Sequence, residues 1–238
     1  MFSDERPEIT AADVAESLGV ARSTAYRYLQ SLGRSGFLTE TGRGGFRLGS
    51  RILELARIAR RGHGLSDICV PEMRKLASEF HQTVLLTKRM GDVVVCLERE
   101  ESTEQHVRLS YERGTVLTLN AGASALVLLA WMPDGRVREL MAEARLPRYN
   151  GNTLCDPDAI VARLGEIRQR GYAVSNAEVD SIVMGIAAPI FHRDDEVLAA
   201  VSVVMISSLV SAAQVGEIKD RLAAVAAGLS AEVRLLDQ

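Results

Sequence analysis

The residues best suited to chemistry lie close together near the start of the chain, between Ala21 and Leu32. At about 100° per residue, a helix over this range puts small polar and basic side chains on one face. Such side chains donate hydrogen bonds to phosphate oxygens and to acceptors on base edges, which is the chemistry of DNA binding. The residues predicted to contact DNA are Arg22, Ser23, Thr24, Tyr26, Arg27, Gln30 and, further along the chain, Arg43.

The arginines are distributed unevenly along the sequence. From Val20 to Arg61, nine arginines stand against two glutamates, a net charge of +7, whereas the whole chain carries −3, so that the rest carries −10. A basic block beside an acidic remainder indicates that one part of the chain meets a polyanion and the other does not. A solvated helical face can also be basic by chance, so charge alone does not establish DNA binding.

The other candidates for chemistry are the neighbouring carboxylates of Glu178 and Asp180 and four scattered histidines. None of them lies in a nucleophile motif, a phosphate loop or a metal-ligand spacing. The cysteines, Cys69, Cys96 and Cys155, fit neither a disulfide framework nor a zinc site. We therefore predict that the chain is not an enzyme, has no catalytic residues and holds no metal or cofactor.

A helix-turn-helix is the element expected to present the DNA-contacting face. Thr10 can cap a first helix together with Asp13, and Gly19 can end that helix in a left-handed conformation. The second helix then places its N-terminal part against the bases. Its buried stripe is expected to consist of Ala25, Leu29 and Leu32, with Tyr28 at the border. An ordinary amphipathic helical hairpin is the alternative interpretation.

A short ribbon after the second helix favours a winged helix-turn-helix. Strands are expected at Phe37–Glu40 and Phe46–Leu48, around a tip at Thr41–Gly45 whose glycines let Arg43 approach a phosphate backbone. The rival interpretation is a glycine-rich nucleotide loop. Such a loop needs a helix directly after it, and a lysine in its phosphate-loop form. Here a strand follows, and Lys75 is the first lysine in the chain.

We predict three parts: a winged helix-turn-helix domain at 1–49, a linker helix at 50–63 and an effector-binding domain at 64–238. The helix from Ser50 to Arg61 can pair with its copy in a dimer, since apolar residues recur along it at three- and four-residue spacing. This apolar face consists of Leu48, Ile52, Leu55 and Ala59. Without an apolar run of about 18 residues or a signal-peptide core, the chain is expected to be cytoplasmic, with no membrane partner.

The third part is expected to be an α+β domain with an antiparallel sheet, because strands, helices and further strands alternate with hairpins. Its predicted helices are Leu65–His81, which could split at Pro71, Ala121–Met132, 133–144, Asp156–Arg170 and Ala212–Leu236. Its predicted strands are Thr83–Lys88, Val93–Glu98, Val107–Ser110, Thr115–Leu119, Ile182–Phe191 and Val197–Met205.

Two groups of motifs resemble a known family when taken together. The first group comes before the linker helix and consists of STAYRYLQSLGRSGFL and GGFRLG. The second group comes after the linker helix and consists of GYAVSNAEVDSIVMGIAAPIF and HRDDEVLAAVSVV. In this order they resemble the IclR family of bacterial transcriptional regulators. The resemblance implies a GAF-like effector domain, a homodimer or homotetramer, and binding of double-stranded operator DNA as a repressor. A small, often carboxylate-bearing metabolite would tune that binding.

By this resemblance, the effector lies between the segment around Asn120 and the last two strands. Backbone N–H groups at the start of the following helix could hold an anion together with Ser124; close packing is the alternative role for the small residues. The predicted ligand-binding residues are Asn120, Ala123, Ser124, Ser175, Gly185 and Ser202. Asn120 replaces the usual histidine, and Val204 stands where some relatives have a second serine, which should make the pocket more apolar.

Relatives usually carry a further helix before the one that Thr10 opens, whereas only nine residues precede Thr10 here. The first helix of the DNA-binding domain is therefore expected to be short or missing. An oligomeric metabolite-binding or interaction module with impaired DNA binding is accordingly the alternative function.

Overall fold

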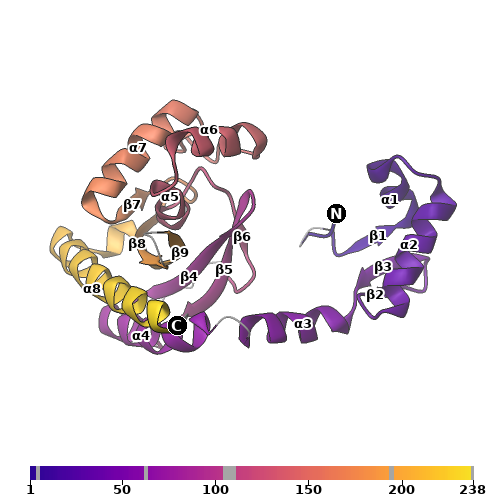
Figure 1. Cartoon of the computed structure of the whole chain (residues 1–238), viewed down its shortest axis with the longest axis horizontal. Coiled ribbons are helices and arrows are strands. Elements are labelled where there is room, and N and C mark those ends of the chain that lie inside the picture. Colours follow the sequence, from indigo (N-terminus) through magenta and orange to yellow (C-terminus); the bar gives the residue numbers. More distant parts are fainter. Residues whose placement is uncertain (4–5, 62–63, 104–110, 193–195, 237–238) are drawn as a thin grey trace. The chain divides into compact units, whose positions relative to one another are not determined.

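The chain forms two compact units in a computed structural model, which describes all residues except 4–5, 62–63, 104–110, 193–195 and 237–238 (Figure 1). The side chains of residues 59–61 also lie outside the described part. By their contacts, the first unit runs from Met1 to His63 and the second from Gly64 to Gln238.

The first unit combines two short helices with a three-stranded antiparallel sheet and ends in a third helix. Thr10 accepts a hydrogen bond from the backbone N–H of Asp13, and the Asp13 carboxylate accepts one from the N–H of Thr10 in return, at 3.3 and 2.7 Å. This capping box starts the first helix, and Gly19 ends it with φ at 63°. The elements are β1 (Glu8–Thr10), α1 (Ala11–Leu18), α2 (Arg22–Arg34), β2 (Leu38–Glu40), β3 (Gly45–Leu48) and α3 (Ser50–Arg61).

Strand β1 turns the expected two-stranded ribbon into a sheet in the order β1-β3-β2. Among the described residues before α1, the chain therefore forms a strand rather than a helix. Ile9 on β1 is buried, and Phe46 of β3 is its cross-strand partner. The small core of this unit contains Ile9, Ala11, Val14, Ala25, Leu29, Leu38 and Phe46.

The second unit is built on a six-stranded antiparallel sheet in the order β6-β5-β4-β9-β8-β7. The α+β class predicted from the sequence is confirmed. One strand, β7, was not predicted, while the strand expected at Val107–Ser110 lies entirely outside the described residues. The strands are β4 (Thr83–Met90), β5 (Val93–Glu100), β6 (Val116–Leu117), β7 (Ala173–Asn176), β8 (Val183–Phe191) and β9 (Val197–Ile206).

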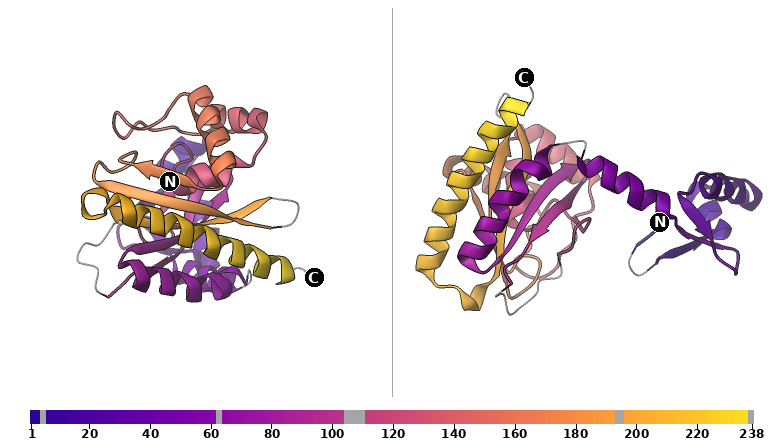
Figure 2. Two further views of the ribbon diagram at one scale, coloured as in Figure 1. Left: turned by 90° about the vertical axis from the view of Figure 1, so that its left-hand side faces the viewer. Right: turned by 90° about the horizontal axis from the view of Figure 1, so that it is seen from below.

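Helices cover both faces of this sheet (Figure 2). Because side chains alternate along a strand, Val201 and Val203 of β9 pack with α4 and α8, whereas Ala200 and Ser202 face the other layer. The helices are α4 (Leu65–Phe80), α5 (Ala123–Ala130), α6 (Asp134–Glu143), α7 (Pro157–Arg170) and α8 (Ala212–Leu236), with a 3-10 turn at Ser207–Leu209.

Helix α4 continues through Pro71, although the sequence suggested a split there. Cys69 and Met73, on either side of this proline, are fully buried and anchor the helix to the core. No described helix combines the length and apolar character that crossing a bilayer requires.

Candidate DNA-binding face and effector cavity

Helix α2 presents an open basic face. Arg22, Ser23 and Arg27 are exposed, whereas Thr24 and Gln30 are half-buried. The helix begins after Ala21, which supplies no side-chain cap to the first-turn N–H groups. An uncapped helix start beside two arginines is suited to a phosphate group.

The orientation of Tyr26 differs from the prediction. Its ring packs edge-on against Phe46, with centroids 6.0 Å apart, and its hydroxyl donates to Glu40 at 3.2 Å. Conversely, Leu32, which was predicted to lie in the buried stripe, is 45% exposed, and Tyr28, which was predicted to lie at its border, is 50% exposed. Both predictions were wrong. The sheet packs on the Tyr26 side of α2, and this contact turns the buried face away from Leu32.

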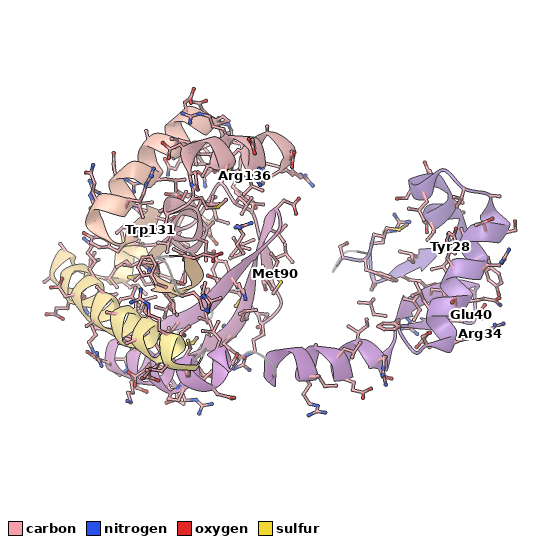
Figure 3. The ribbon with its side chains drawn as sticks, viewed as in Figure 1. Tyr28, Arg34, Glu40, Met90, Trp131 and Arg136 are labelled. Atoms are coloured by element: carbon pink, nitrogen blue, oxygen red, sulfur yellow. The ribbon has the colours of Figure 1, made fainter. Side chains whose placement is uncertain are left out.

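The open face of α2 therefore contains residues that the sequence reasoning missed. Tyr28 and Arg34, both labelled in Figure 3, are exposed alongside Arg27. The signal that could have revealed them is Phe46. Successive residues of a strand face opposite sides, so the exposed Arg47 implies that the Phe46 ring lies on the inner face of the ribbon. A large side chain from α2, which is Tyr26, is needed to cover that ring.

The ribbon tip places Arg43 in solvent at the end of the wing. The N–H of Thr41 donates to the carbonyl of Gly45 at 2.8 Å, and that of Gly44, with φ at 74°, donates back to Thr41 at 3.1 Å. The Thr41 hydroxyl also donates to the Glu8 carboxylate at 2.9 Å. A Cβ on Gly45 would overlap the Glu8 side chain, which would have to move from the position in which it accepts this bond.

The second unit contains a cavity between the start of α5, strands β4, β8 and β9, and the loops around Tyr111 and Tyr149. Its empty space, about 590 Å³, includes open solvent at the mouth. Its lining includes five of the six residues predicted to bind a ligand, namely Ala123, Ser124, Ser175, Gly185 and Ser202.

Asn120, the sixth predicted residue, does not line the cavity. It is fully buried, and its amide nitrogen donates to the carbonyls of Pro147 and Leu154 at 3.1 and 2.8 Å. Asn120 was predicted to bind the ligand because it stands where relatives usually have a histidine. In this chain an amide with two donors instead ties the 147–154 segment to the start of α5.

Two hydroxyl groups meet at the inner end of the cavity. The Ser124 hydroxyl on α5 donates to that of Ser202 on β9 at 3.0 Å, and both residues are more than nine-tenths buried. Ser202 accepts this bond and keeps its own proton for a further acceptor. A Cβ on Gly185 would lie 3.5 Å from that of Ala123, which is an ordinary van der Waals contact, so a larger residue would point toward the start of α5.

A carboxylate from the β7–β8 loop closes one side of the helix start. Glu178 accepts a hydrogen bond from the N–H of Gly122 at 3.0 Å. Burial raises the pKa of this carboxyl group, while the bonds from Gly122 and Ser175 and the charge of Arg163 act in the opposite direction. The N–H groups of Ala123 and Ser124 come next along the helix, and both residues line the cavity.

The rest of the lining is mostly apolar, through residues such as Leu85, Val183 and Val204. Tyr111, Tyr149 and Asp180 also line it, and none of them was predicted. They lie in irregular segments, where no periodic pattern marks a residue as facing a cavity. Among the described residues, no group of histidines, cysteines and carboxylates could hold a metal ion.

Family models match both units of the chain. The model described as bacterial transcriptional regulator IclR C-terminal matches residues 59–231, and the one described as IclR helix-turn-helix domain matches residues 1–42. A curated relative is the HTH-type transcriptional regulator BhcR of Paracoccus denitrificans. It is 32% identical over 196 residues, which are 82% of this chain and 70% of that protein.

Solved structures agree with this assignment. A putative IclR regulator from Silicibacter sp. TM1040 is 28% identical, with a TM-score of 0.88, covering 98% of this chain and 92% of that one. An IclR homologue from Microbacterium hydrocarbonoxydans, solved with 4-hydroxybenzoate, is 26% identical, with a TM-score of 0.77 and coverage of 98% and 95%. The chain thus belongs to the IclR family of bacterial transcriptional regulators, with a helix-turn-helix domain followed by an effector-binding domain.

Proposed function

We propose that this regulator is a cytoplasmic repressor that binds operator DNA as a homodimer or homotetramer and responds to a small carboxylate-bearing metabolite. Helix α2 would enter the major groove, with Arg22, Ser23 and Arg27 toward DNA, and Arg43 would contact the backbone from the wing. The exposed, basic and uncapped start of α2 supports this role. Of the other predicted contacts, Thr24 and Gln30 would contact DNA from the edges of this face of α2. Tyr26 would hold α2 in place through its packing on Phe46.

The observation that carries the carboxylate assignment is the donor set at the inner end of the cavity. The backbone N–H groups of Ala123 and Ser124 lie at a helix start, and the Ser202 hydroxyl has a proton to donate. Helix N-termini favour negative charge, and such donors can hold a carboxylate without a cation. The related protein solved with 4-hydroxybenzoate was bound to a carboxylate of this kind.

The proposed oligomer rests on the apolar surface of α3. Leu53 is 75% exposed and Ile58 48% exposed, while Ile52 and Leu55 are half-buried. Exposed apolar residues on a helix are covered when the helix pairs with its copy. A dimer would also read two half-sites and so raise specificity.

A gel-shift titration with the DNA upstream of the chain's own gene tests the proposal. We expect binding that weakens steeply with salt, because arginine–phosphate contacts release counterions. Isothermal titration calorimetry with a panel of metabolite carboxylates, followed by gel shifts in the presence of those that bind, tests the effector. Absence of salt-sensitive binding at low ionic strength would overturn DNA regulation; DNA binding that no carboxylate changes would overturn the effector class.

A further inference from the structure

The effector cavity continues outward past its polar inner end to an acidic mouth. A second hollow is lined in part by the same residues, Tyr111, Tyr149, Val179, Asp180 and Val183. A ligand held at the start of α5 therefore lies in the same cavity as Tyr111, Tyr149 and Asp180. The outer end of such a ligand would meet two phenols and one carboxylate.

The Asp180 carboxylate at this mouth retains the capacity to accept further hydrogen bonds. One oxygen accepts from the N–H of Ile182 at 3.2 Å, which fixes the side chain in its loop. The structure gives the other oxygen no bond within the described part of the chain. The neighbouring Tyr149 hydroxyl is within hydrogen-bond distance, 3.3 Å, of that of Thr118, so this phenol is already engaged.

The charges around the cavity restrict the ligands that it can hold. Asp180 is the one charged side chain among the described lining residues, and Glu178 lies directly behind the helix start. A carboxylate bound there adds a negative charge beside Glu178, and Asp180, which is exposed at the mouth, adds a further negative charge to the same cavity. A ligand that brings a positive charge or a hydrogen-bond donor to Asp180 offsets this repulsion.

We propose that the effector is a monocarboxylate whose opposite end carries a hydrogen-bond donor, an ammonium or a hydroxyl group, and that Asp180 accepts from it. This inference rests on the proposed carboxylate site at the start of α5. Dicarboxylates are excluded by the same charges, because their second carboxylate would face Asp180. Asp180 is thus the residue that sets specificity at the outer end of the effector.

Calorimetry on the full chain tests this with straight-chain acids of butyrate, pentanoate and hexanoate length, each in ω-amino, ω-hydroxy and unsubstituted form. At the length that spans the cavity, we expect a donor-bearing acid to bind at least about tenfold more tightly than its unsubstituted counterpart. Tighter binding of the ω-amino acid identifies an ammonium group at the outer end of the effector, and tighter binding of the ω-hydroxy acid identifies a hydroxyl group there.

The variant Asp180→Asn keeps an oxygen for the N–H of Ile182 but loses the negative charge. In this variant the ω-amino acid should lose most of its advantage in affinity over the unsubstituted acid. The unsubstituted acid should bind the variant more tightly than it binds the parent chain. Asp92→Asn, in the exposed β4–β5 turn, is the matched control and should change neither affinity. The ligand series on the parent chain remains decisive if Asp180→Asn fails to fold.

Each contrary result has a distinct meaning. If unsubstituted acids bind as tightly as donor-bearing ones at every length, the role of Asp180 is overturned and the carboxylate site stands. A donor preference that persists unchanged in Asp180→Asn also overturns it. If no acid of any length binds, both the carboxylate site and the inference drawn from it fail.

Discussion

The Ser124 and Ser202 hydroxyls lie 3.0 Å apart, although 78 residues separate them in the chain. This bond joins the start of α5 to the middle of β9 at the inner end of the effector cavity. It places two polar groups next to the backbone donors of the helix start in an otherwise mostly apolar lining. The pair therefore defines the polar end of the cavity.

Ser202→Ala should weaken carboxylate binding about tenfold, because it removes a buried donor and leaves the Ser124 hydroxyl without its acceptor. Isothermal titration calorimetry with an acid that binds the parent chain measures this. Ser78→Ala, an exposed position on α4, is the control. Equal affinities in Ser202→Ala and the parent would place the ligand elsewhere.

Val204→Ser should shift the cavity toward smaller and more polar acids. Val204 is buried, lines the cavity two residues after Ser202, and so faces the same side of β9. Calorimetry of parent and variant with acids of increasing length checks the shift. A parent chain that already prefers the smallest and most polar acids would contradict the apolar character assigned to this side of the cavity.

Asn120→Ala should lower the free energy of unfolding by about 1 to 2 kcal/mol, since the part-buried carbonyls of Pro147 and Leu154 lose their donor. Urea denaturation of the full chain measures the loss. Asn176→Ala, at an exposed position on β7, should have little effect. If the two variants are equally stable, Asn120 does not hold the 147–154 segment.

Glu178→Gln should alter the pH dependence of stability. Burial raises the pKa of Glu178 in the folded chain, so its favourable contribution is complete below the ordinary pKa of a glutamate and is lost as the pH rises through the folded-state value. The stability of the parent relative to Glu178→Gln should therefore fall between about pH 4 and pH 7. Denaturation at both pH values tests this; a constant or rising difference would contradict the assigned sign.

The sequence was informative wherever one local signal determined the outcome. Thr10 and Asp13 form the expected capping box, and the glycines around Arg43 form the expected ribbon tip. Likewise Ser124 and Ser202, expected on facing elements, meet in the cavity. In each case neighbouring residues, or motifs shared with a family, carried the information.

Tertiary contacts decided the features that the sequence analysis missed. The periodicity of α2 permits either Leu32 or Tyr26 to flank the buried stripe, and packing against Phe46 selects Tyr26. Strand β1 exists because Ile9 fits the small core, not because three residues form a recognisable pattern. Asp180 reaches the cavity from a loop, where neither propensity nor spacing predicts direction.

The central claim is that α2 binds DNA, and comparing two arginine variants tests it most directly. Arg27 is exposed on the open face of α2, whereas Arg168 pairs with Asp134 at 2.6 Å in the other unit, an ion pair that contributes little to stability. Fluorescence anisotropy with a labelled operator fragment, at several salt concentrations, gives the affinities. We predict that Arg27→Ala weakens binding at least about tenfold and reduces the salt dependence, while Arg168→Ala leaves both nearly unchanged. Equal losses in the two variants, or none in Arg27→Ala, would contradict the assignment of α2 as the DNA-binding helix.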